Sequence, residues 1–121
     1  MYIHGIDIIE ISRVSKAHTS WGERFLKRIY TEGEIQYCSN RAPELAARFA
    51  AKEAVMKALS TGHIGISPQD IEVLPDENGA PVLNLKGRAR ARAHQAGIRN
   101  LVISLSHSKD YAIASVIGES G

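Results

Sequence analysis

The sequence predicts an α+β fold in which helices pack on a mostly antiparallel sheet. A strand pattern opens the chain, a long run of helix-forming residues fills its middle, and short strand patterns separated by turns dominate its last third. The chain has 121 residues, of which 44% are apolar and 23% charged. That length and balance predict a single folded domain over residues 1–121 and argue against a disordered chain.

Residues 2–11 are expected to form the first strand. Ile3, Gly5, Asp7, Ile9 and Ile11 fall on one face, and Tyr2, His4, Ile6, Ile8 and Glu10 fall on the other. Because both faces are largely apolar, we expect a central strand that is buried on both sides. Asp7 then stands in an apolar row, where an unpaired carboxylate is costly.

Short helices are expected next. Ser12 is a suitable cap for a helix around residues 13–17, and a second helix is expected near residues 21–29. Thr31 and Glu34 have the spacing of a capping box that opens a helix ending near residue 39.

The segment from residue 44 to about residue 59 carries the clearest helical signal, and Pro43 marks its start. Eleven of the fifteen residues 45–59 are apolar, which is typical of a buried helix. Four charged residues interrupt this segment: Arg48, Lys52, Glu53 and Lys57. Glu53 precedes Lys57 by four residues, the favourable order for an ion pair.

The remaining elements follow from strand patterns and turn signals. We expect strands at 71–74 and 82–85 around a turn at 76–79, a helix at 88–96, and strands at 101–107 and 111–117 around a turn at 108–110.

Charge and cysteine content exclude several classes of protein. The net charge of +2 is too small for a dedicated nucleic-acid binder, yet residues 12–30 and 86–99 each hold five Lys or Arg. Such segments suggest an anionic partner. No apolar stretch approaches the roughly 20 residues of a membrane span, and the first residues lack a secretory signal pattern. The single Cys38 is expected to be a buried thiol in a reducing cytoplasm.

Two acidic residues are candidate metal ligands. A buried Asp7 on a strand and a buried Glu53 on a helix need a cation between them, and either Lys57 or a divalent ion would serve. Mg²⁺ is often held by one or two carboxylates together with phosphate oxygens and water. The spacing of Cys and His residues does not suggest zinc.

Residues 106–109 form a second candidate cluster. Ser106, His107, Ser108 and Lys109 offer donors suited to phosphate at the end of a strand. The sequence contains no glycine-rich phosphate loop, and no nucleophile elbow supports a hydrolase built on Ser106 and His107.

Together these residues resemble the holo-[acyl-carrier-protein] synthases, the small bacterial 4′-phosphopantetheinyl transferases. The matching segments run nearly end to end: residues 5–8, Glu10, Arg13, Arg24, Phe25, Arg28, residues 31–34, residues 48–54 (Arg-Phe-Ala-Ala-Lys-Glu-Ala), Lys57, Ala58, Thr61, Gly62, residues 70–73, Asn78, Gly79, Pro81 and residues 104–108.

The resemblance implies that the chain has a 4′-phosphopantetheinyl transferase-like fold. It also implies transfer of 4′-phosphopantetheine from coenzyme A to a serine of apo acyl carrier protein, with release of adenosine 3′,5′-bisphosphate, in support of fatty acid biosynthesis. Mg²⁺ is required, and Mn²⁺ is a possible substitute. Asp7 and Glu53 become the metal ligands, and Lys57 contacts the diphosphate and stabilises the transition state, so Glu53 and Lys57 are the implied catalytic residues.

Other implied contacts with coenzyme A come from Arg48 at the 3′-phosphate, from Ser60, Thr61 and Gly62 at the adenine, and from Ser106, His107 and Ser108 at the nucleotide end. The base that takes the serine proton stays open between Glu53 and a metal-bound water; His107 is not favoured.

The resemblance also implies partners. An acidic acyl carrier protein would dock on Arg13, Arg24, Phe25 and Arg28. The family forms homotrimers in which a neighbouring subunit supplies the residues around His107. A cytoplasmic enzyme without nucleic-acid or membrane partners is therefore expected.

Two other readings remain. A small basic nucleic-acid-binding domain would explain the basic segment 88–92, which has no role in the family, but not the buried acids. A coenzyme A-binding regulator without catalysis would keep the ligand site and lack the transfer reaction.

Overall fold

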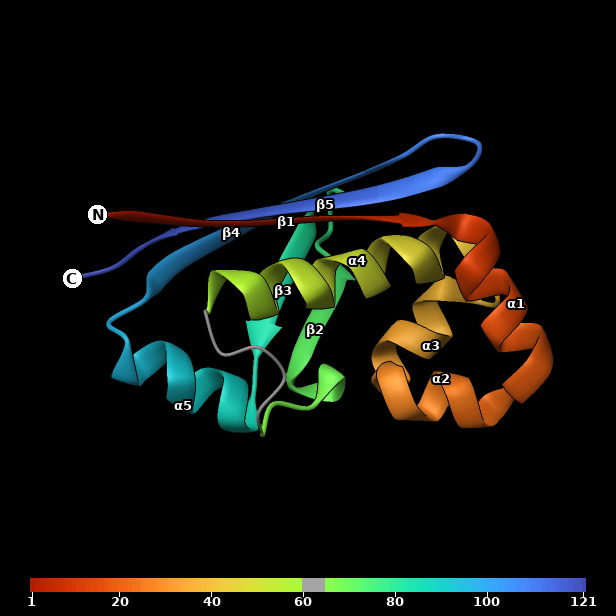
Figure 1. Ribbon diagram of the computed structural model, residues 1–121, viewed down its shortest axis with the longest axis horizontal. Helices are drawn as coiled ribbons and strands as arrows, with labels where there is room; N and C mark the ends of the chain where they lie inside the picture. Colours follow the sequence, from red (N-terminus) through yellow and green to blue (C-terminus); the bar gives the residue numbers. More distant parts are fainter. Residues whose placement is uncertain (60–64) are drawn as a thin grey trace.

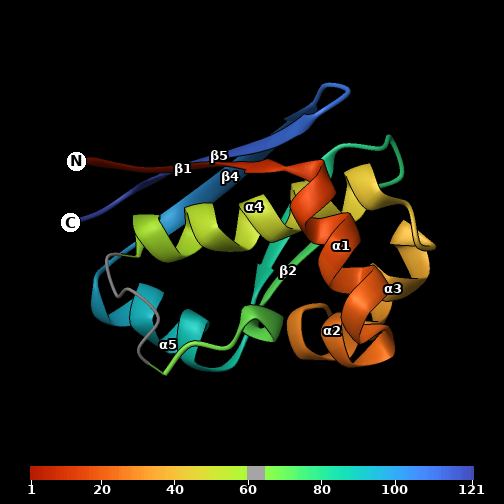
Figure 2. The same ribbon diagram turned by 45° about the vertical axis from the view of Figure 1, so that its right-hand side comes forward.

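A long helix lies beneath a three-stranded antiparallel sheet, and shorter helices flank both of its ends (Figures 1 and 2). The computed structural model describes residues 1–59 and 65–121. The elements are β1 (Tyr2–Glu10), α1 (Ile11–Trp21), α2 (Glu23–Ile29), α3 (Glu32–Cys38), α4 (Ala42–Ala58), a 3₁₀ turn (Pro68–Asp70), β2 (Ile71–Pro75), β3 (Pro81–Leu85), α5 (Gly87–Gln95), β4 (Arg99–His107) and β5 (Tyr111–Glu119). The strand order β1-β5-β4 and the separate β2–β3 hairpin confirm the predicted α+β class.

The position of β1 corrects one prediction. This strand is an edge strand that pairs only with β5 in the described sheet, and Ile6 and Ile8 are 48% and 59% exposed. Its other face, with Gly5 and Asp7, turns toward α4. An apolar row on each face therefore does not mean that both faces are covered within one chain.

Gly5 sets the distance between β1 and α4. A Cβ atom built on Gly5 would lie 2.0 Å from the Ala54 carbonyl oxygen and 3.0 Å from the Ala58 backbone nitrogen. Only glycine allows the strand to approach the helix backbone this closely. Gly5 thus brings Asp7, two residues further along, next to the same helix.

Gly5→Ala is therefore expected to lower the free energy of unfolding by ~1–3 kcal/mol, since backbone atoms must move to admit the methyl group. The free energy of unfolding in urea measures the effect. Gly33→Ala is the matched control because its nearest contacts are side-chain atoms at 3.3 Å and beyond. Equal losses in both variants would contradict this role of Gly5.

The helix boundaries agree with most of the sequence signals. The Thr31 hydroxyl accepts from the Glu34 backbone, and the Glu34 carboxylate accepts from the Thr31 backbone, so the capping box is confirmed. Pro43 lies in the first turn of α4. The first helix differs: α1 starts at Ile11, directly after β1, and Ser12 lies inside it rather than at its cap.

Cys38 is fully buried and free. Burial raises the pKa of its thiol to about 11. The thiolate is therefore scarce near neutral pH, and the expected structural thiol is confirmed.

Candidate active site

One open stripe runs along α4. Between Leu45 and Leu59, only Phe49, Glu53 and Lys57 escape full burial. These residues are four positions apart, so their side chains lie on one face of the helix. The other residues of this segment are buried, so the rest of the helix surface is covered while this face stays open.

Asp7 meets this stripe at Lys57. The Lys57 ammonium donates to the Asp7 carboxylate at 2.8 Å and to the Ile6 carbonyl at 3.0 Å. Lys57 is 56% exposed, whereas Asp7 is 19% exposed. The structure therefore brings Asp7 and Lys57 together, with Glu53 one helical turn away from Lys57, at an edge that solvent reaches.

The donor set suits a hard divalent cation that shares its ligands with phosphate. In the described residues, three or more His, Cys, Asp or Glu side chains do not gather at any point. A closed, all-protein metal cage is thus absent from this part of the chain. Two carboxylates beside an open face match the way Mg²⁺ is held together with substrate phosphates and water.

Arg48 and Lys52 lie on a different side of α4. Arg48 is 3% exposed; its guanidinium donates from Nε to the Val73 carbonyl at 3.1 Å and pairs with Glu44 at 3.4 Å. The Arg48 guanidinium also lies 4.6 Å from the centre of the Tyr37 ring. The structure does not bring Arg48 to Asp7: its guanidinium instead contacts Val73, Glu44 and Tyr37.

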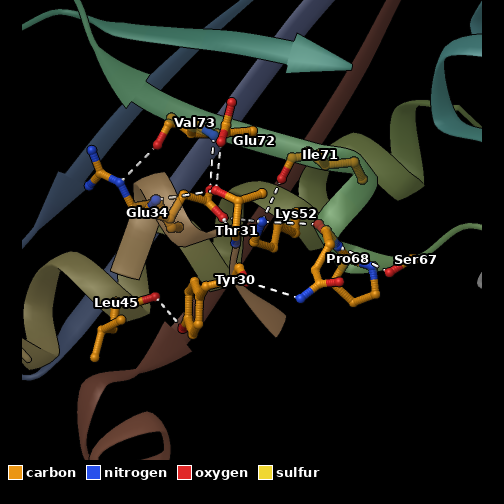
Figure 3. Close-up of polar contacts among 12 residues, drawn as sticks. Tyr30, Thr31, Glu34, Leu45, Lys52, Ser67, Pro68, Ile71, Glu72 and Val73 are labelled. Carbon is orange, nitrogen blue, oxygen red and sulfur yellow. Dashed lines mark hydrogen bonds and ion pairs between the residues drawn. The ribbon is translucent and has the colours of Figure 1, made fainter. Parts of the chain in front are cut away.

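Lys52 belongs to a buried polar network between α3, α4 and β2 (Figure 3). Its ammonium donates to the Glu34 carboxylate at 2.7 Å and to the Pro68 and Ile71 carbonyls. Glu34 is fully buried and also accepts from the Val73 backbone at 2.9 Å. The network fastens the β2–β3 hairpin to the helices.

The pKa values in this network follow its burial. Burial lowers the pKa of Lys52, while the Glu34 carboxylate opposes that shift. Burial also raises the pKa of Tyr30, whose hydroxyl donates to the Leu45 carbonyl at 2.7 Å. For Glu72, burial would raise the pKa, but hydrogen bonds from Thr31 and Lys86 outweigh it and hold the pKa below its ordinary value.

The residues around His107 lie elsewhere in the sheet. His107 ends β4, Asp7 is on β1, and β5 separates the two strands. His107 is level with Ala112 of β5 and Ile9 of β1, so it lies two strands across and two residues along from Asp7 within one chain. Ser106, His107 and Ser108 are all exposed. The other predicted adenine contacts, Ser60, Thr61 and Gly62, lie outside the described residues.

The predicted docking residues gather around a pocket at the α1–α2 corner. Arg24, Phe25 and Arg28 line this pocket of about 290 Å³ together with Ala17 and Trp21. Arg13 is exposed on α1 but does not line it. Sequence reasoning missed Trp21, which is 62% exposed. The signal was present, since a lone tryptophan within a basic segment is typical of a binding surface.

Comparisons with known proteins identify the family of the chain. The family model of the 4′-phosphopantetheinyl transferase superfamily matches residues 4–116. The chain belongs to this superfamily. Among its curated relatives, a holo-[acyl-carrier-protein] synthase of Halothermothrix orenii is 48% identical over 97% of this chain and 96% of its own length. One of Dehalococcoides mccartyi, strain 195, is 50% identical over 98% of this chain and 99% of its own.

Solved structures of the superfamily share the fold. The Helicobacter pylori holo-[acyl-carrier-protein] synthase in complex with coenzyme A is 33% identical and has a TM-score of 0.86, over 97% of this chain and 100% of that chain. The Neisseria meningitidis enzyme is 32% identical with a TM-score of 0.87, over 98% of each chain. The family and transferase fold predicted from the sequence are thus confirmed.

Proposed function

We propose that this superfamily member transfers 4′-phosphopantetheine from coenzyme A to a serine of an apo acyl carrier protein. The serine oxygen bonds to the phosphorus next to pantetheine, the bond from that phosphorus to the bridging oxygen breaks, and adenosine 3′,5′-bisphosphate leaves. The convergence of Asp7 and Lys57 beside Glu53 carries the proposal. The relatives named for this activity support it.

Asp7 and Glu53 would hold Mg²⁺, or Mn²⁺ in its place. When bound, the ion supplies positive charge to the diphosphate and its leaving group. The carboxylates fix the position of that charge, and the buried β1–α4 contact at Gly5 fixes Asp7 in turn.

Lys57 would turn from Asp7 to the diphosphate. Its side chain is 56% exposed, so the ammonium can leave the Asp7 carboxylate without unpacking the core. A cation placed where charge develops on the leaving group stabilises the transition state. The base that takes the serine proton stays open between Glu53 and a metal-bound water.

The exposed face of the sheet supports the proposed homotrimer. Ile6 and Ile8 of β1, Val102 of β4 and Ile117 of β5 are 44–59% exposed. Such an apolar surface is typical of an interface between subunits. A neighbouring copy would bring its Ser106, His107 and Ser108 to the coenzyme A site, since these residues lie away from Asp7 within one chain.

A reconstituted assay tests the function. The protein is mixed with apo acyl carrier protein, coenzyme A and Mg²⁺, and the carrier is weighed by mass spectrometry. The expected result is a mass gain of one phosphopantetheine arm, lost when a chelator replaces Mg²⁺. If this protein binds coenzyme A but the carrier gains no mass, the protein would instead be a ligand-binding regulator.

Docking of the carrier gives a separate prediction. Arg24→Glu is expected to raise the KM for the carrier protein about tenfold and leave the KM for coenzyme A unchanged, because a repulsive charge now faces an acidic partner. Lys27→Glu is the matched control: it reverses a charge on the same helix, but Lys27 lines another pocket. If Arg24→Glu raised the KM for the carrier protein and the KM for coenzyme A equally, the result would contradict the proposed docking surface.

The structure describes no helix in residues 1–59 and 65–121 that is long and apolar enough to cross a membrane. We propose that the protein acts in the cytoplasm. We also propose that residues 1–121 form a single domain.

A further inference from the structure

Residues of β3, α5 and the start of β4 line a second pocket. Helix α5 and the start of β4 lie at the opposite end of the molecule from α1 and α2, which carry the docking surface (Figure 1). The volume of the second pocket is about 540 Å³, which is within the range of small-molecule sites. The residues proposed for transfer and for carrier docking do not line it. The proposed transfer reaction and carrier docking therefore do not account for this pocket.

Helix α5 divides its basic residues between two faces. Arg92 donates to the Leu59 carbonyl at 3.2 Å, and Arg88 lies against Gly65, so this pair faces the end of α4. Arg90 and His94 are also four residues apart but line the pocket. Within the described part of the chain, the side chains of Arg90 and His94 have no hydrogen-bond or ion-pair partner.

The opposite wall of the pocket is close to neutral. Arg99 pairs with Glu119 at 3.7 Å, and the Asn100 side-chain amide donates to the same carboxylate at 2.9 Å. The unbalanced positive charge is therefore on the α5 side, at Arg90, with the His94 ring on the same face of the helix. Acidic side chains are absent from the described lining.

Aliphatic side chains form the rest of the lining. Leu83 and Leu85 of β3 and Leu101 of β4 are half-buried and border the pocket. A ligand that places only a charge at Arg90 would leave this apolar surface in water. The pocket thus combines a basic side with an apolar side.

We propose that this pocket binds an amphipathic anion, whose carboxylate or phosphate head lies at Arg90 and His94 and whose aliphatic part covers Leu83, Leu85 and Leu101. The planar fork of a guanidinium matches the oxygen atoms of both carboxylate and phosphate groups. The site therefore specifies a negatively charged head group and does not distinguish between these two. The basic segment of α5 gains a role that phosphopantetheine transfer does not require.

Calorimetric titration of the full chain tests the ligand class. The probes are octanoate and octyl phosphate, with octanol and inorganic phosphate as compounds that carry only one of the two features. We expect saturable 1:1 binding of at least one octyl anion. Octanol and inorganic phosphate should bind at least tenfold more weakly, which corresponds to a difference of ~1.4 kcal/mol in binding free energy. The tighter of the two octyl anions identifies the head group. Octanol binding as tightly as both anions would overturn the proposal.

Two charge-matched variants locate the binding. Arg90→Gln is expected to weaken binding of the preferred octyl anion at least tenfold, whereas Arg88→Gln, on the other face of α5, changes it less than about twofold. Saturating coenzyme A leaves the binding unchanged, and Arg90→Gln retains full phosphopantetheine transfer. Equal losses in the two variants, or displacement of the anion by coenzyme A, would overturn the assignment. This result is independent of whether the proposed transferase activity is found.

Discussion

Glu53→Gln is expected to lower Mg²⁺-dependent transfer by at least ~10²-fold while the free energy of unfolding stays within ~0.5 kcal/mol of the wild type. The amide keeps the shape of the side chain but removes the negative charge that would hold a divalent cation beside the diphosphate. Glu53 lies on the open stripe of α4, where water reaches part of the side chain, and an amide fills the same space. Single-turnover transfer to the carrier measures the first effect and urea unfolding the second.

Glu32→Gln is the control for this variant. Glu32 is an exposed carboxylate on α3 and does not line the α4 stripe. Its loss should leave transfer within twofold of the wild type. Full activity in Glu53→Gln would exclude a catalytic or metal-binding role for this carboxylate.

Lys52→Met should cause the largest loss of stability, about 3–5 kcal/mol. Lys52 and Glu34 are 2% and 0% exposed, so removal of the ammonium leaves a carboxylate without its counter-charge in a site that water does not reach. The midpoint of urea unfolding should fall accordingly. Methionine retains most of the volume of the lysine stem, which separates the effect of charge from that of a cavity.

Lys27→Met provides the matched comparison. Lys27 pairs with Glu23 at 3.7 Å, but both side chains are more than 70% exposed. Because water screens such a pair, the expected loss is at most ~0.5 kcal/mol. In addition, the double variant with Lys52→Met and Glu34→Leu should recover part of the stability lost in Lys52→Met. A loss below 1 kcal/mol in Lys52→Met would contradict the buried network.

The sequence predicted the elements that local signals define. The capping box at Thr31 and Glu34 and the helix start at Pro43 were visible because they depend on residues a few positions apart. The pairing of Asp7 with Lys57 could be proposed because a carboxylate in an apolar row needs a cation. Each of these predictions follows from the chemistry of one residue or of residues a few positions apart.

Long-range contacts were less accessible. The sequence indicates Lys52 as a charge on a buried helix, but its partner Glu34 lies on another helix, where its spacing from Thr31 indicates only a cap. Similarly, the apolar faces of β1 could not reveal that Ile6 and Ile8 face outward, because alternation does not show which face a helix of the same chain covers. Such contacts depend on how distant elements meet.

Pulsed electron paramagnetic resonance of Mn²⁺ bound with coenzyme A tests most directly whether Asp7 and Glu53 hold a divalent cation against the diphosphate. The account predicts a hyperfine coupling between manganese and phosphorus in the wild type, and its loss, with at least tenfold weaker Mn²⁺ binding, in both Asp7→Asn and Glu53→Gln. Unchanged coupling and affinity in both variants would contradict it.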